Sequence, residues 1–68
     1  MVDTNKLRGC IVAKGKTQEE VAKSIGITPK TFSLRMKKRV FGSDEIEKMI
    51  DLLDIDDPMP IFFAKSVT

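Results

Sequence analysis

Apolar side chains recur along this chain at the spacing of amphipathic helices. Between residues 44 and 53, four of them fall three or four positions apart and so share one helix face: Ile46, Met49, Ile50 and Leu53. Leu7 and Ile11 form a second stripe, with Cys10 beside them as a small apolar residue. The pattern predicts an all-α fold of five helices without strands.

Local start and stop signals give the bounds of these helices. The first three are expected from about Asn5 to Lys14, from Gln18 to Ile25 and from Pro29 to about Lys38. The fourth is expected after Ser43, a capping residue, because Asp44 and Glu45 in the next turn favour a helix N-terminus. Asp57 and Pro58 predict the cap and first residue of a short last helix.

The segment 17–36 has the sequence form of a helix-turn-helix, two short helices joined by a tight turn. Thr17 is placed to cap the first of them, and Glu20, three residues on, completes a capping box. Gly26 follows the last helical residue, where a left-handed backbone is least costly for glycine. Thr28 and Pro29 then supply the cap and first residue of the second helix.

The same segment resembles a known family. The motif Gln18-x-x-x-Ala22-x-x-x-Gly26-Ile27-Thr28, followed by Phe32-Ser33, is similar to the helix-turn-helix of Xre/Cro-type phage repressors. The order of the flanking segments also resembles small Cro-like phage regulators, so the resemblance covers roughly residues 6 to 63. It implies a lambda-repressor-like DNA-binding domain, here one domain over residues 1–68, with the helix-turn-helix at the second and third helices.

Two positions depart from the family pattern. An aliphatic or aromatic residue is common at the position of Arg35, so Met36 is expected to take over its packing. Asp54 stands where a glycine commonly ends the fourth helix, so this aspartate is expected to adopt a left-handed conformation. Both departures weaken a detailed transfer of DNA contacts from the family.

The outward face of the third helix follows from its inward face. If Phe32 and Met36 point into the core, a rotation of about 100° per residue leaves Lys30, Leu34 and Lys37 pointing outward. A lysine donates to guanine O6 or N7, whereas a leucine offers apolar contact to a thymine methyl. The alternative for each exposed lysine is simply a solvated surface.

Other polar residues complete the candidate DNA-binding set. The glutamine that matches Gln18 in the phage repressor class contacts the DNA backbone and braces the recognition helix; the alternative is a polar residue that only initiates a helix. Thr28 and Thr31 lie near the start of the third helix, within reach of a phosphate or a base edge. The candidates are Gln18, Thr28, Lys30, Thr31, Ser33, Leu34, Lys37 and Lys38.

Charge is distributed unevenly along the chain. Residues 1–42 contain ten Lys/Arg and three Asp/Glu, a net charge of +7, whereas residues 43–57 contain one Lys and seven Asp/Glu, a net charge of −6. The basic part contains the helix-turn-helix segment, as a surface that faces phosphates requires. The acidic part is expected to face away from DNA or toward a partner.

Composition excludes several other classes of function. The chain has one cysteine and no histidine, so it cannot form an internal disulfide, a histidine-bearing metal site or a histidine-based catalytic triad. It has no apolar run of the ~18 residues that a membrane span needs and no signal-peptide pattern, and its single cysteine is consistent with a reducing cytoplasm. The resemblance to phage repressors implies that this is the cytoplasm of a bacterial host cell. No enzyme activity, cofactor, metal or small-molecule ligand is expected.

The sequence therefore predicts a transcriptional regulator that binds double-stranded operator DNA, in the manner of a phage or prophage Cro-like repressor. A homodimer on palindromic sites is expected, because one recognition helix reads few base pairs. The segment 61–63 and Leu52 are the candidates for its interface, and the segment 61–63 also qualifies for the core. The alternative is a protein-interaction or antitoxin-like module with the same fold.

Overall fold

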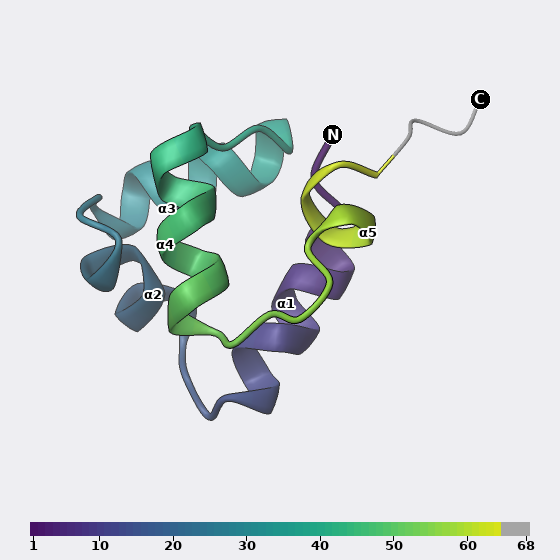
Figure 1. The fold of residues 1–68 in the computed structure, drawn as a ribbon. Helices are drawn as coiled ribbons and strands as arrows, with labels where there is room; N and C mark the ends of the chain where they lie inside the picture. Colours follow the sequence, from purple (N-terminus) through teal and green to yellow (C-terminus); the bar gives the residue numbers. More distant parts are fainter. Residues whose placement is uncertain (65–68) are drawn as a thin grey trace.

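The structure is a computed structural model that describes residues 1–64. It contains, in chain order, α1 (Thr4–Ala13), α2 (Gln18–Ser24), α3 (Pro29–Lys38), α4 (Ser43–Leu52) and α5 (Met59–Phe62). The expected all-α chain of five helices is confirmed over this range, and no strand occurs in it. Figure 1 shows α2, α3 and α4 grouped on one side, with α1 and α5 on the other. None of the described helices is long and apolar enough to span a membrane.

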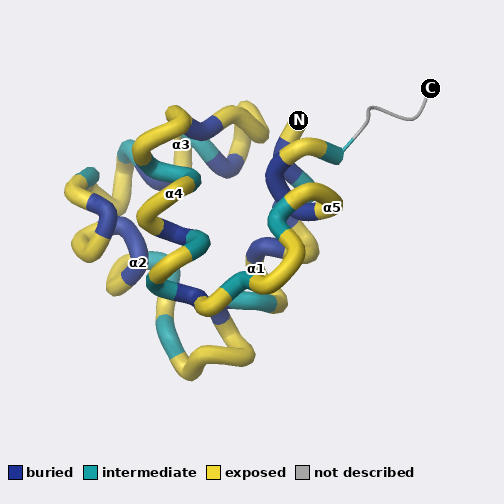
Figure 2. The backbone as a smooth tube through the Cα atoms, in the orientation of Figure 1, coloured by how far each residue is buried: buried dark blue, intermediate teal, exposed yellow. Residues whose placement is uncertain are grey.

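A single apolar core lies between these helices, and the inward side of each helix is buried (Figure 2). Its largest fully buried side chains are Phe32, Leu7, Ile11, Met49 and Val21. Phe32 of α3 meets Phe41 edge-on, with 5.4 Å between ring centroids and 61° between planes. This pair joins α3 to the loop that leads into α4.

The core differs from the expected one at several positions. Ile46 and Ile50 of the predicted stripe are half-buried and pack against the edge of the core, as do Ile27 and Cys10. Val2 and Phe41 are buried although no helical stripe indicated them. Ile61 and Phe62 are also buried, which is the core alternative for the segment 61–63. The core is thus closed partly by residues from a terminal segment, a loop and the shortest helix.

The N-terminal caps of α2 and α3 are those expected. Thr17 Oγ1 accepts a hydrogen bond from the Glu20 N–H (3.1 Å), and Glu20 Oε1 accepts one from the Thr17 N–H (2.9 Å). Thr28 Oγ1 accepts from the Thr31 N–H at 3.1 Å, and Pro29 is the first residue of α3. The start of α1 was expected at Asn5 but lies one residue earlier, because Asp3 caps the helix through the Lys6 N–H (3.1 Å).

Two expected caps are wrong. Ser43 is the first helical residue of α4 rather than its cap, which is Gly42. Glu45 Oε1 accepts a hydrogen bond from the Gly42 N–H at 2.9 Å, and this bond satisfies an amide at the start of the helix. Asp57 does not cap α5: Pro58 holds that position, and the helix begins at Met59.

Each of the helices α1 to α4 is followed, within two residues of its end, by a residue with a left-handed backbone. At two of these ends the residue is a glycine, Gly15 (φ 66°) and Gly26 (φ 84°). At the other two it is Arg39 (φ 59°) and Asp54 (φ 49°). The left-handed Asp54 was expected and is confirmed, and the Ile55 N–H donates to the Ile50 carbonyl at 3.0 Å across this turn. The left-handed Arg39 was not expected.

The first residues of the chain connect two distant parts of the fold. The Val2 N–H donates to the Arg39 carbonyl at 3.0 Å, and the Asp3 N–H donates to the Ile61 carbonyl at 2.6 Å. This N-terminal segment therefore holds the end of α3 beside α5.

Candidate nucleic-acid interface

The candidate interface is built on α2, α3 and the turn between them. Val21 and Ala22 of α2 are buried, as is Ile25, the C-cap of this helix, and the small Ala22 allows the two helices to pack closely. Gly26 has a positive φ, and the Ile27 N–H donates to the Ala22 carbonyl at 3.0 Å. This turn of four residues, 25–28, fixes where α3 begins relative to α2.

Helix α3 has one buried side and one exposed side. Phe32 is 1% exposed and Met36 is 5% exposed, so these two side chains anchor the helix in the core. The predicted outward positions of Lys30, Leu34 and Lys37 are confirmed, since all three are exposed. Ser33 and Lys38 are also exposed, and Thr31 is half-buried. The contact of these residues with DNA stays a prediction.

The two threonines at the start of α3 are hydrogen-bonded to each other. Thr28 Oγ1 accepts from the Thr31 N–H, and the two hydroxyl oxygens lie 2.9 Å apart. One of the two hydroxyls donates in this contact, so the other keeps its proton for a group in solvent. Thr28 is exposed, Thr31 is half-buried, and Gln18 is half-buried at the first position of α2.

An ion pair that the sequence did not indicate fixes α3 against α4. Arg35 donates from Nε to Glu45 Oε1 (3.0 Å) and from Nη2 to Oε2 (3.2 Å), a two-point contact with defined geometry. The Glu45 side chain is only 14% exposed, and it also accepts the Gly42 N–H. Met36 takes over the core packing, as expected. Arg35 therefore does not pack in the apolar core, and its bonds to Glu45 link α3 to the first turn of α4.

The Arg35 hydrogen bond lowers the pKa of the Glu45 carboxyl; burial opposes this shift, and the Gly42 N–H adds to it. The Lys14 ammonium, 2.6 Å from Asp54 Oδ2, likewise lowers the pKa of that exposed carboxyl. A carboxyl group whose pKa is lower in the folded state than in the unfolded state stabilises the fold when the pH is above its unfolded-state pKa. This stabilisation is lost as the pH falls through the folded-state pKa. Both carboxylates therefore stabilise the fold at neutral pH.

The free energy of unfolding should accordingly fall as the pH drops below the ordinary Glu value of 4.5, and continue to fall down to the lower pKa of the folded state. Urea titrations followed by circular dichroism between pH 7 and pH 2 would measure this decline. Glu45→Gln should lower stability at neutral pH and make the acid decline shallower. An equally steep decline in Glu45→Gln and the unchanged protein would contradict the role given to this pair.

Other candidate chemistry does not gather at this surface. Asp54, Asp56 and Asp57 are all exposed, and the described residues contain no group of three carboxylate or thiol side chains that could hold a metal ion. Asp54 has a structural role in the turn after α4, and its bond to Lys14 joins the end of α4 to the end of α1.

The chain belongs to the family described as "Protein of unknown function (DUF739)", whose model matches residues 1–65. A search of the curated proteins and a search of the solved structures found no match. One family model thus spans all five helices, including the candidate interface on α2 and α3. The family description names no activity, so the function is argued from the surface itself.

Proposed function

We propose that this member of the DUF739 family is a sequence-specific regulator that binds double-stranded DNA. In this proposal α2 and α3 act as a helix-turn-helix, and α3 enters the major groove. The observation that supports it best is the division of α3 into a side anchored by Phe32 and Met36 and an exposed side with Lys30 and Leu34.

The exposed side chains of α3 divide into two roles. Lys30, in the first turn, is placed to donate to guanine, and Leu34, one turn later, to contact a thymine methyl. Lys37 and Lys38 lie in the last turn and are suited to phosphates, whose recognition needs charge rather than a specific hydrogen-bond pattern. Ten residues of helix span about 15 Å, which is enough to present both groups along one groove.

The charge distribution supports the same orientation. The segment that forms α1, α2 and α3 lies within the part of net charge +7, and α4 lies within the part of net charge −6. Phosphates attract the first part and repel the second, so DNA is expected against α3 with α4 turned away. Binding in this proposal is stoichiometric, with two copies of the chain on a palindromic operator.

A protein-interaction or antitoxin-like role is the second candidate, and the exposed acidic side of α4 favours it. Asp44, Glu47 and Asp51 are all exposed on this helix, where they would suit a basic protein partner. The two candidates use different surfaces, α3 for DNA and α4 for protein. A variant on the exposed side of α3 therefore tests DNA binding without disturbing the acidic side of α4.

Selection of bound sites from a random pool of DNA duplexes, followed by salt titration on the selected site, tests the proposal. The logarithm of affinity should fall linearly with the logarithm of salt concentration, with a slope of about −0.9 per phosphate neutralised; roughly four to six phosphates per subunit are expected. Lys38→Ala should make the slope shallower by about one. An affinity for DNA that does not depend on salt concentration would refute the proposal. If the chain selects no DNA but binds a protein through α4, the second candidate is favoured.

A further inference from the structure

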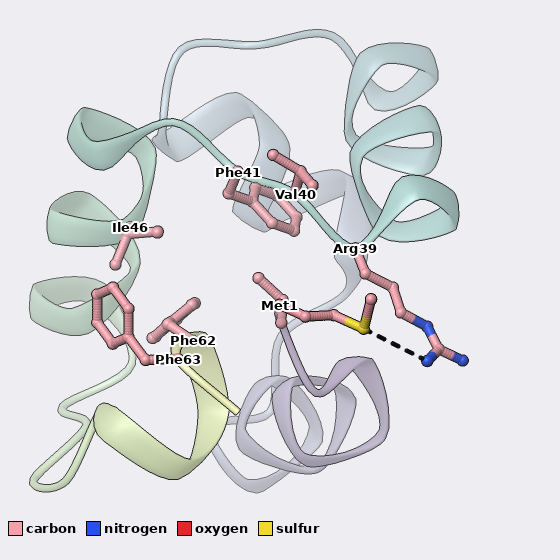
Figure 3. Close-up of a pocket in the computed structure, with 8 residues that line it drawn as sticks. Met1, Arg39, Val40, Phe41, Ile46, Phe62 and Phe63 are labelled. Atoms are coloured by element: carbon pink, nitrogen blue, oxygen red, sulfur yellow. Dashed lines mark hydrogen bonds between the residues drawn. The ribbon is translucent and has the colours of Figure 1, made fainter. Parts of the chain in front are cut away.

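An apolar groove of about 220 Å³ opens between the N-terminal segment, the loop from α3 to α4, and the helices α4 and α5 (Figure 3). The apolar side chains that line it include Met1, Val40, Phe41, Ile46, Phe62 and Phe63. Three of them are largely exposed, Met1 at 57%, Val40 at 64% and Phe63 at 53%. Single exposed apolar residues are ordinary, but several around one groove mark an interaction surface.

The two adjacent phenylalanines of this groove have separate positions. Phe62 is 2% exposed and completes the core, whereas Phe63 follows the last residue of α5 and remains outside. The two neighbouring side chains therefore point in different directions. Figure 3 shows Phe63 on the same side of the groove as Ile46 of α4. Phe63 thus has an aromatic ring at the rim of an apolar depression that it does not fill.

We propose that this groove is the contact surface for a second copy of the chain, with Phe63 of each copy seated in the groove of the other. The inference deepens the proposed function, because it rests on the need for two copies on one operator and names the surface they use. A two-fold dimer requires one patch that contains both a projecting group and the depression that receives it. Phe63 and the hollow beside Met1 and Val40 meet this requirement within one patch.

Charge along the two edges of the groove also favours a second copy and orients it. Arg39 lies on the edge formed by the end of α3, and Ile46 lies on the opposite edge, formed by α4 (Figure 3). Glu47 directly follows Ile46 and is exposed, and a rotation of about 100° per residue places it about 60° around α4 from Ile50. A two-fold axis that runs along the groove brings the Arg39 edge of one copy against the Glu47 edge of the other. An axis across the groove would pair like charges, which is unfavourable.

The position of the groove leaves the proposed DNA-binding face free. The groove lies at the C-terminal end of α3, and neither Lys30 nor Leu34 lines it.

The small area of the groove predicts weak association. A standard interface of about 800 Å² per partner would cover roughly a sixth of the 4654 Å² surface of this chain, far more than one small groove offers. Association of the free protein is therefore expected to be weak, and binding to two adjacent half-sites should strengthen it.

Sedimentation of the DNA-free protein over a wide concentration range tests the interface. Phe63→Glu should raise the dimer dissociation constant at least tenfold while the circular dichroism spectrum stays helical. Val12→Glu is the matched control, since Val12 is exposed (73%), lies on α1 and does not line the groove. Equal effects of the two variants would overturn the proposal, as would a chain that stays monomeric both free and on palindromic DNA.

Charge exchange tests the orientation in the same assay. Arg39→Glu and Glu47→Lys should each weaken dimerisation severalfold, and the double variant should recover most of the loss. A double variant that dimerises more weakly than either single variant would overturn the paired edges.

Binding to a full palindrome and to a half-site separates this inference from the proposed function. If Phe63→Glu loses self-association and the unchanged chain binds no DNA, the interface is upheld and the proposed function is refuted. If Phe63→Glu and the unchanged chain bind the palindrome equally well, the interface alone is refuted.

Discussion

Phe32→Ala should lower the free energy of unfolding by about 3–5 kcal/mol, the cost of removing a fully buried aromatic ring. The Phe32 side chain is 1% exposed and contacts the Phe41 ring edge-on. Globular domains have about 0.05–0.15 kcal/mol of stability per residue, which gives roughly 3–10 kcal/mol for 68 residues. The variant is therefore expected to be partly or wholly unfolded at room temperature.

Urea titration at the helical circular dichroism band measures this effect, because the chain has no Trp or Tyr for fluorescence. Phe63→Ala provides the matched control, since it removes the same ring from a position that is 53% exposed. At a protein concentration at which the chain is monomeric, the control should change stability by well under 1 kcal/mol, as is usual for surface substitutions. Equal losses in the two variants would show that Phe32 does not anchor α3 as described.

Lys30→Ala should cost about 1–3 kcal/mol in binding to the preferred operator if this side chain donates to a guanine. The loss should be confined to one base pair in each half-site, where the preference should relax. Thermal stability should hardly change, because Lys30 is exposed and distant from the buried side of α3. Titration of the operator and its single-base variants with the unchanged and substituted chains gives both quantities.

Two further substitutions on α3 serve as comparisons for Lys30→Ala. Leu34→Ala removes apolar contact only, so we expect a smaller loss at a thymine. Lys38→Ala removes a phosphate contact and should weaken binding to all sequences about equally. If Lys30→Ala and Leu34→Ala weakened every sequence to the same extent as Lys38→Ala, α3 would position the protein on DNA without reading bases.

Features set by neighbouring residues were predictable from the sequence. The capping box of Thr17 and Glu20, the bounds of α3 and the left-handed Asp54 all depend on residues within one turn of each other. The inward and outward sides of α3 follow from the same helical spacing. The surface proposed to bind DNA could therefore be drawn before the structure was known.

Features that depend on distant residues were not predictable in this way. Val2 and Phe41 are buried because the N-terminal segment and the loop after α3 fold against other helices, and neither residue belongs to a helical stripe. The Arg35–Glu45 pair joins two helices, and the bond from the Gly42 N–H to Glu45 moves the cap of α4 away from Ser43. Periodicity along one helix contains no information about such partners.

The bond between Asp3 and Ile61 has a consequence for how the chain folds as it is made. Ribosomes add about 5–20 residues per second, so the Asp3 amide waits roughly 3–12 s before its partner carbonyl is synthesised. During that time α1 lacks the cover of Ile61 and Phe62, and its apolar side has no complete core to enter. The domain is therefore expected to complete its folding only once α5 has been synthesised, and a chain interrupted before α5 should expose this surface to aggregation.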